Sequence, residues 1–334
     1  MAGLRYEAGM SKLVTVFGGS GFLGRHTVRA LAKAGYRIRV AVRRPLSAYF
    51  LPPMGTVGQI QLFKCEVQDK DQVAAALAGA DAAVNLTGIL YQSGHNSFEG
   101  LHVEAAQNIA EAAHAAGIAT LVHVSTLGAD PQSPSQYACT KGEGEAKIRA
   151  AFPEATILRP SLVFGPEDRL FNKFAALARM VPALPLIGGG KTRFQPVFVG
   201  DVAAAILRAV EDTGTRGKTY ELGGPTVYTY KDMMRIMLET IGRRRLLVPV
   251  PFFLASIKAF FLQMSKLVTV EPLLTPDQVT FLKTDHVVQD GMPGVAELGI
   301  TPVAMEAVLP SYLWRFRAKG QFEAPVTSRA PAPR

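Results

Sequence analysis

The chain has 334 residues, a hydrophobic fraction of 48% and a formal net charge of +9 at pH 7. This length and apolar content fit a globular protein with a large core and exclude a disordered chain. The basic excess favours phosphorylated ligands, anionic membrane surfaces or acidic protein partners, and no stripe of basic and aromatic residues indicates a nucleic-acid partner. Two cysteines cannot form a disulfide framework, and six scattered histidines show no metal-ligand spacing, so we expect no metal site.

The opening segment predicts a dinucleotide-binding fold. An apolar run at Leu13–Phe17 enters a glycine loop at Gly18–Gly24, and a helix-compatible stretch follows to about Ala34. A second apolar run lies at Ile38–Val42. Strand, phosphate loop, helix and strand in this order form the first half of such a fold. Residues 1–12 are interpreted as an N-terminal extension without a secretory signal.

The glycine loop is expected to hold a pyrophosphate. Gly18 permits the tight turn, Gly21 lets the backbone approach the phosphates, and Gly24 lets the helix lie near the strand. The helix N-terminus then supplies free N–H groups and a partial positive charge. The remaining candidate cofactor-binding residues of this loop are Ser20, Phe22 and Leu23.

Strands and helices alternate through the first half of the chain, which predicts an α/β fold with a doubly wound parallel sheet of the Rossmann type. Further strands are expected at Ile60–Phe63, Ala82–Leu86, Leu121–Val124 and Thr156–Leu158. Helices are expected at about Asp71–Ala78, Phe98–Ala116 and Tyr137–Ala151.

After Pro160 the pattern is less regular and predicts a small C-terminal lobe. We expect a Rossmann domain over residues 13–225, with lobe segments from about 161, a lobe over 226–318 and a disordered tail over 319–334. The elements expected there are a helix at Leu170–Met180, a loop at Val181–Gly190, a strand at Pro196–Val199, a helix from an Asp201 N-cap to about Val210, a strand at Lys218–Leu222 and a helix at Tyr230–Ile241.

Residues at the ends of the strands indicate the cofactor. The second strand ends at Arg43 and Arg44 with no carboxylate, and a guanidinium can pair with the 2′-phosphate of NADPH. The sequence therefore favours NADPH, with NAD as the alternative. Glu66 and Val67 follow the third strand, where an adenine edge would lie. The small residues after the fourth strand would leave room for ribose and pyrophosphate, at Leu86, Thr87 and Gly88.

A tyrosine and a lysine mark the candidate chemistry. Tyr137 and Lys141 are four residues apart and would share one face of a helix. The lysine ammonium can lower the tyrosine pKa and can bind a nicotinamide ribose, so the tyrosine could pass a proton to a carbonyl while hydride arrives. Ser125 or Thr126, at the end of the fifth strand, could orient the substrate.

These motifs resemble the short-chain dehydrogenase/reductase superfamily, in its extended or atypical branch. The resemblance rests on GGSGFLG at Gly18–Gly24, NLTG at Asn85–Gly88, HVST at His123–Thr126, YACTK at Tyr137–Lys141, LRPSLVFGPED at Leu158–Asp168 and PVFVGDVA at Pro196–Ala203. It implies that Tyr137 and Lys141 are the catalytic pair. It also implies that Arg159–Ser161 borders the nicotinamide, and Pro160 and Val163 are candidate cofactor-binding residues.

Three longer stretches are similar to one atypical branch, the NADPH-binding accessory subunit of respiratory complex I, as a bacterial member. They are Phe152–Ala175, Val181–Ala203 and Leu273–Val288. The resemblance implies tightly held NADPH, a mainly structural role in assembly or stability and subunits of the peripheral arm as partners. It implies a peripheral place on the cytoplasmic side of the inner membrane. Because Tyr137 and Lys141 are retained, an active reductase or an epimerase/dehydratase-type enzyme is the alternative.

One segment of the lobe could contact a membrane. Arg243–Arg245 precede the apolar stretch Leu246–Met264, which could form a helix from Phe252 onward. A basic cluster beside an apolar helix can lie in a membrane interface or dock into a partner. The alternative is a core helix that closes the substrate side of the fold. No run of eighteen uncharged apolar residues predicts a membrane-spanning helix.

Overall fold

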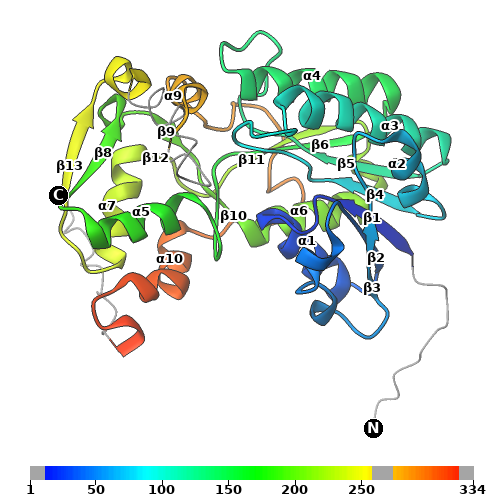
Figure 1. Ribbon diagram of the computed structural model, residues 1–334, viewed down its shortest axis with the longest axis horizontal. Coiled ribbons are helices and arrows are strands. Elements are labelled where there is room, and N and C mark those ends of the chain that lie inside the picture. The colour runs from blue at the N-terminus through cyan, green and yellow to red at the C-terminus, as the bar shows by residue number, and fades with distance from the viewer. Residues whose placement is uncertain (1–11, 258–273, 323–334) are drawn as a thin grey trace. The chain divides into compact units, whose positions relative to one another are not determined.

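The computed structural model describes residues 12–257 and 274–322, which form two compact units (Figure 1). The first unit contains residues 12–133, Ala138–Arg159 and Ala203–Tyr220. The second contains Pro134–Tyr137, Pro160–Val202 and the described residues from Glu221 onward. The units are therefore interleaved along the chain, and the polypeptide passes between them several times.

A seven-stranded sheet with the order β11-β6-β5-β4-β1-β2-β3 organises the first unit. The ladders that join β3 to β6 through β2, β1, β4 and β5 are all parallel. The strands are β1 Leu13–Phe17, β2 Arg37–Val42, β3 Ile60–Lys64, β4 Ala82–Asn85, β5 Thr120–Val124, β6 Thr156–Pro160 and β11 Thr219–Leu222. The predicted doubly wound parallel sheet is confirmed.

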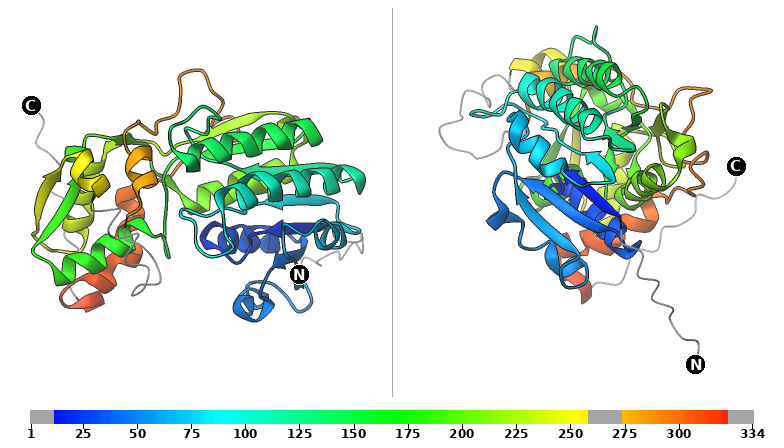
Figure 2. Two further views of the ribbon diagram at one scale, coloured as in Figure 1. Left: turned by 45° about the horizontal axis from the view of Figure 1, so that its top comes forward. Right: turned by 90° about the vertical axis from the view of Figure 1, so that its right-hand side faces the viewer.

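Helices cover both faces of this sheet (Figures 1 and 2). One face carries α2, α3 and α4, and the other carries α1 and α6. Their bounds are α1 Phe22–Lys33, α2 Lys70–Leu77, α3 Ala105–Ala115, α4 Gln136–Ala151 and α6 Val199–Glu211. Side chains of β1, α3 and α4 meet in one apolar core, where Phe17, Ile109 and Ile148 are buried. Burial of this kind drives the packing of helices on a parallel sheet.

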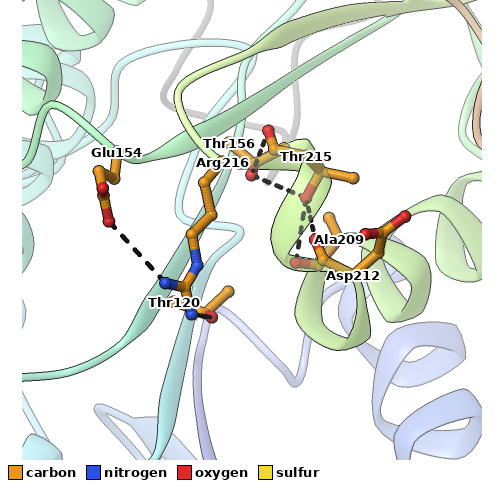
Figure 3. A network of polar contacts seen from close by, with 7 residues as sticks. All are labelled: Thr120, Glu154, Thr156, Ala209, Asp212, Thr215 and Arg216. Atoms are coloured by element: carbon orange, nitrogen blue, oxygen red, sulfur yellow. Dashed lines mark hydrogen bonds and ion pairs between the residues drawn. The ribbon is translucent and has the colours of Figure 1, made fainter.

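A polar network anchors the amino-terminal ends of β5 and β6 (Figure 3). Arg216 donates to the hydroxyl of Thr120 at 3.3 Å and lies 3.9 Å from the carboxylate of Glu154. The Thr156 hydroxyl donates to the carbonyl of Thr215 at 3.0 Å. Ligands of doubly wound sheets bind at the carboxyl ends of the strands, so this network supports the opposite end.

The second unit is built from short ladders and helices around its own core. It contains β7 Val163–Phe164, α5 Leu170–Met180, β8 Ala183–Ile187, β9 Arg193–Phe194, β10 Val197–Phe198, β12 Tyr228–Thr229, α7 Tyr230–Thr240, β13 Leu246–Val250, α9 Pro276–Phe281 and α10 Met305–Leu313. Methionines of α7 pack with Phe171 of α5 and Leu309 of α10 in the buried centre.

Several predicted boundaries were wrong. The expected loop at Val181–Gly190 contains strand β8, which pairs in parallel with β13. The prolines suggested a loop because a proline has no N–H to donate to a ladder. Both strands of a two-stranded sheet are edge strands, where proline is tolerated. The expected N-cap Asp201 lies inside α6, which begins at Val199, and its carboxylate accepts from the N–H of Val303 instead.

Other expectations were modified in detail. The segment expected as one helix at Phe98–Ala116 begins with a π-helix at Glu99–Glu104 and continues as α3. The expected strand at Pro196–Val199 is reduced to β10. In the tail expected to be disordered, Gly320–Phe322 forms a 3₁₀ turn, and residues 323–334 lie outside the described residues.

The candidate membrane segment is described only in part. Its first residues form β13, residues 252–257 are helical, and residues 258–264 lie outside the described residues. Ala255 is buried, whereas Phe253, Leu254 and Ile257 are about half exposed or more. Within the described ranges 12–257 and 274–322, no helix has the length and apolar content needed to cross a bilayer.

Candidate functional site

The phosphate loop joins β1 to α1 as its glycines predict. Gly18 has a φ of +75°, and a Cβ there would lie 2.8 Å from the carbonyl oxygen of Leu86. A Cβ at Gly24 would lie 2.4 Å from the carbonyl oxygen of Gly18. Both positions therefore require glycine, the first for conformation and the second for close packing.

The N-terminus of α1 is free to bind an anion. Gly21 is the N-cap, so no side chain caps the helix, and no acidic residue lies in the first turn. The first N–H groups of the helix are left without intrahelical partners, and the helix dipole favours negative charge there. This arrangement fits the pyrophosphate of a dinucleotide. Ser20, Phe22 and Leu23 complete the turn.

Two exposed arginines follow β2. The Arg43 guanidinium donates to the amide oxygen of Asn96 at 2.6 Å. Asn96 itself is held by two backbone hydrogen bonds with Ser93. Neither Arg43 nor Arg44 forms an ion pair with any residue that the structure describes. Their positive charge is therefore available to an anionic ligand at the carboxyl end of β2.

The residues after β3 offer one acceptor. Glu66 Oε1 is buried and has no hydrogen-bond partner within the described ranges. The backbone N–H of Glu66 donates to Gln72 Oε1 at 3.0 Å, which holds this turn. A buried acceptor without a donor suits an amino group such as that of adenine. Val67, by contrast, packs its side chain into the core, so only its backbone could reach a ligand.

The residues after β4 form an open turn beside the lysine. Asn85 Oδ1 accepts from the N–H of Thr87 at 3.0 Å and from its hydroxyl at 2.6 Å. The Asn85 Nδ2 donor is buried and has no partner among the described residues. A Cβ at Gly88 would lie 3.6 Å from Lys141 Nζ. The predicted residues Leu86, Thr87 and Gly88 therefore lie between the phosphate loop and Lys141.

Lys141 is buried beneath this turn. Its ammonium donates to the carbonyl of Val124 at 2.9 Å. Burial lowers its pKa to about 8, although Glu145 acts in the opposite direction. Glu145 itself pairs with Arg159 at 2.7 Å. The pKa of Lys141 is therefore closer to neutral pH than the pKa of an ordinary lysine.

Tyr137 lies one helical turn before Lys141 on α4, as the spacing predicts. Tyr137 and Asp277 of α9 both belong to the second unit, and the backbone N–H of Tyr137 donates to the Asp277 carboxylate at 3.1 Å. Its ring packs edge-on against Phe281, with 5.4 Å between the ring centroids. Asp277 also accepts from Ser135 Oγ at 3.1 Å and from the N–H of Gln136 at 2.7 Å, so it caps the start of α4.

The structure distinguishes the two candidate hydroxyls after β5. The Thr126 hydroxyl donates to the carbonyl of Leu127 at 3.3 Å. Ser125 Oγ is buried and has no partner among the residues described. A buried hydroxyl without a partner is available to a ligand, so the geometry favours Ser125 over Thr126.

Two candidate cofactor residues lie in the second unit. Pro160 ends β6 and is buried, and Val163 pairs with Val197 in the ladder of β7 and β10. Tyr137 belongs to this unit as well, whereas the glycine loop, Ser125 and Lys141 belong to the first.

Sequence reasoning missed His102. Its Nε2 accepts from the N–H of Ile89 at 3.1 Å, and its Nδ1 lies 3.0 Å from Thr140 Oγ1. Because Nε2 accepts, Nδ1 carries the proton and donates to the hydroxyl. Burial, reinforced by Lys141, lowers the pKa of His102 to about 2. No sequence spacing links Ile89, His102 and Thr140, which come from three separate segments of the chain.

His123 of β5 is a second buried histidine. Burial lowers its pKa well below 6.5, with smaller effects from Lys141 and His102. Neither ring nitrogen has a hydrogen-bond partner in the described part of the chain. That part also holds no group of three or more histidine, cysteine or carboxylate side chains that could bind a metal ion.

A glycine loop on a doubly wound parallel sheet and a Tyr-x-x-x-Lys helix define a dinucleotide-binding protein of the short-chain dehydrogenase/reductase type. The sequence profile of the "NAD dependent epimerase/dehydratase family" matches residues 14–223. The chain belongs to this family.

Individual related proteins give a more specific similarity than the family profile. The protein named NADH dehydrogenase [ubiquinone] 1 alpha subcomplex subunit 9, mitochondrial, of Arabidopsis thaliana is 37% identical over 330 residues. The alignment covers 96% of this chain and 82% of that protein. The Ceramide reductase of Caulobacter vibrioides is 31% identical over 247 residues, which cover 72% of this chain and 74% of that protein.

Solved structures share the fold. The dTDP-glucose 4,6-dehydratase DesIV of Streptomyces venezuelae, with NAD and TYD bound, superposes with a TM-score of 0.69 at 21% identity. The superposition covers 91% of this chain and 96% of that chain. At this identity the likeness concerns the fold alone.

Proposed function

We propose that this chain is an accessory subunit of respiratory complex I that holds NADP(H) and acts in assembly or stability. The observation that carries the proposal is the 37% identity to the Arabidopsis subunit over 96% of this chain. Similarity over nearly the whole chain includes the second unit as well as the nucleotide-binding sheet. DesIV shares the fold over 91% of this chain at only 21% identity, so a shared fold alone does not account for an identity of 37%.

Arg43 and Arg44 support NADPH over NAD as the resident cofactor. Both are exposed, and neither is neutralised by a carboxylate in the described ranges. A guanidinium can pair with the 2′-phosphate through two hydrogen bonds. The phosphate loop would hold the pyrophosphate, Glu66 would accept from the adenine amino group, and Lys141 would bind the nicotinamide ribose. When bound, the nicotinamide supplies hydride chemistry.

The proposed location follows from the proposed partner. We place the chain on the cytoplasmic side of a bacterial inner membrane, as a peripheral protein beside the peripheral-arm subunits of complex I. Phe253, Leu254 and Ile257, which are about half exposed or more, and the preceding Arg243–Arg245 support contact with a membrane surface or a neighbouring subunit.

The test is to tag the chain in its own organism, isolate complex I on a native gel and measure both protein and cofactor. We expect the chain at a fixed ratio to complex I and about one NADP(H) per copy by enzymatic cycling. Complex I that is complete without the chain would overturn the proposal.

The nucleotide preference is tested separately with purified protein. Arg43→Asp with Arg44→Asp should weaken NADPH binding by roughly 10- to 100-fold, because charged hydrogen bonds contribute about 1.5–3 kcal/mol. NADH binding should not fall, because a carboxylate at this position can accept from the ribose hydroxyls of NAD. Arg179→Asp, an exposed charge change in the second unit, is the matched control. Tighter NADH than NADPH in the wild type would contradict the preference.

A second candidate is an NAD(P)H-dependent reductase. The observation that favours it is the buried Ser125 hydroxyl without a partner among the described residues, together with the retained Tyr137 and Lys141. A carbonyl substrate would accept a proton from Tyr137, which Lys141 assists. Turnover of a carbonyl compound that Tyr137→Phe abolishes would establish this function. Normal respiration and cofactor retention in Tyr137→Phe would exclude it.

A further inference from the structure

The basic excess of the chain is concentrated in one segment of the first unit. Residues 12–65 contain no aspartate or glutamate. The same segment contains nine basic residues, which equals the net charge of +9 of the whole chain. These residues are Lys12, Arg25, Arg29, Lys33, Arg37, Arg39, Arg43, Arg44 and Lys64. The positive field of the protein therefore originates on β1, α1, β2, β3 and their connections.

Helix α1 carries a row of these charges. Arg25, Arg29 and Lys33 are spaced by four residues and share one side of the helix. Arg29, Lys33 and Arg37 are exposed, and none has a side-chain partner among the residues described. Like charges at this spacing destabilise a helix. No acidic residue in the segment offsets that cost, and an external anionic partner would offset it.

Exposed apolar side chains lie beside this row, on the connection from β2 to β3. Leu46 is 77% exposed, Tyr49 is 62% exposed and Val57 is fully exposed. The Arg25 guanidinium carbon lies 4.8 Å from the ring centroid of Phe50, so the connection contacts the charged side of α1. Figures 1 and 2 show this blue segment beside α1.

The connection is held rigidly. Two 3₁₀ turns, Pro45–Ala48 and Pro52–Met54, begin with proline, and Leu51 between them is fully buried. Gln59 Nε2 donates to the carbonyls of Ala32 at 2.7 Å and Tyr36 at 3.0 Å, which ties the connection to the end of α1. The exposed side chains are therefore pre-organised, which reduces the entropic cost of docking.

We propose that this surface docks onto an acidic protein surface with an apolar pocket, on a neighbouring subunit of complex I. We name it the β2–β3 patch, and it comprises Leu46, Tyr49, Phe50, Val57, Arg29, Lys33 and Arg37. This inference rests on the proposed function. A protein partner fits better than a lipid surface because a fixed turn geometry selects a fixed shape. Tyrosine and arginine are also enriched at interface hot spots, and guanidinium groups pair with carboxylates.

A zero-length carbodiimide cross-linker tests the contact in isolated complex I. We expect Lys33 to join to an aspartate or glutamate of another complex I subunit, identified by mass spectrometry. Lys218, an exposed lysine that precedes β11 at the opposite edge of the sheet from β3, is the internal comparison. Absence of Lys33 cross-links in a complex that contains the chain would overturn the inference and leave the proposed function intact.

Variants test the energy of the contact. Arg29→Glu with Lys33→Glu, and separately Tyr49→Ser with Val57→Ser, should each lower the amount of chain in complex I by about tenfold. Lys218→Glu and Phe322→Ser are the matched controls, because both residues are exposed elsewhere. Full retention of the patch variants would overturn the inference. Absence of the wild-type chain from complex I would instead overturn the proposed function.

A vesicle assay separates protein from lipid. The purified chain is sedimented with phosphatidylcholine vesicles with and without phosphatidylglycerol. We expect the patch variants to bind these vesicles as the wild type does. Loss of vesicle binding in the patch variants alone would assign the surface to lipid and overturn the protein partner.

Discussion

Lys141 Nζ donates a hydrogen bond of 2.9 Å to the carbonyl oxygen of Val124, which ties α4 to the carboxyl end of β5. The ammonium is buried at that point, beside the turn that follows β4. A charged group is costly in such surroundings, and the cost appears as a lowered pKa. Burial of the Lys141 ammonium at the candidate ligand site therefore lowers the stability of the folded chain.

This relationship predicts how stability changes with pH. The pKa of Lys141 is about 8 in the folded chain and 10.5 in the unfolded chain. The unfolded state therefore binds more protons between these values, and stability rises with pH across that window. Lys141→Met should be more stable than the wild type at pH 7, by up to about 3 kcal/mol. Urea unfolding of both at pH 7 and 9.5 measures the difference, which should shrink at the higher pH. An equal difference at both values would contradict the buried charge.

The buried histidines predict acid sensitivity. His123 has a pKa well below 6.5 when folded, whereas the unfolded residue is protonated below about pH 6.5. Stability should therefore fall as pH drops below that value, by up to about 1.4 kcal/mol per pH unit for each such histidine. His123→Leu should reduce this slope, as measured by unfolding at pH 7 and 5. An equal slope in the wild type and in His123→Leu would contradict this account of His123.

Substitution of Gly18, the first glycine of the loop, should weaken nucleotide binding. Gly18→Ala would place a Cβ 2.8 Å from the carbonyl oxygen of Leu86 at a φ of +75°. The turn must shift, and the N–H groups that face the pyrophosphate shift with it. We expect NADPH binding, measured by nucleotide fluorescence, to fall by more than about tenfold. Gly35→Ala is the matched control, since its φ is +87° and no atom lies within 4 Å of the added Cβ. It should lower stability by about 1 kcal/mol and leave binding unchanged.

Asp277 predicts the stability of the first turn of α4. Its carboxylate accepts from Ser135 Oγ and from the N–H groups of Gln136 and Tyr137. Asp277→Ala leaves these donors without their partner, which costs about 1–2 kcal/mol for a lost helix cap. Hydrogen exchange of the Gln136 and Tyr137 amides should accelerate about tenfold or more. Asp290→Ala, in an exposed segment, is the control. Unchanged exchange in Asp277→Ala would show that the cap does not hold this turn.

Much of the first unit could be predicted from sequence because its signals are local. Apolar runs placed the strands of the sheet, and β1 has the predicted bounds Leu13–Phe17. The glycine spacing predicted the phosphate loop. The positive φ of Gly18 is a local conformation that glycine adopts readily, so it can be predicted from that one residue. The prolines near β8 and β13 led to the wrong prediction of a loop. A proline in the sequence reveals that one N–H is missing, but it does not reveal whether the ladder needs a donor on that side.

The sequence by itself therefore determined the class of fold, the phosphate loop and the Tyr137–Lys141 spacing, because each depends on backbone preferences and short-range periodicity. Only the tertiary structure decided which polar groups are buried and what they contact. His102 joins Ile89 and Thr140, and Asp277 caps a helix 140 residues away. Among the described residues the buried Ser125 hydroxyl has no partner, whereas the Thr126 hydroxyl donates to the carbonyl of Leu127. Burial and long-range hydrogen bonds arise only when distant segments pack, so no local pattern encodes them.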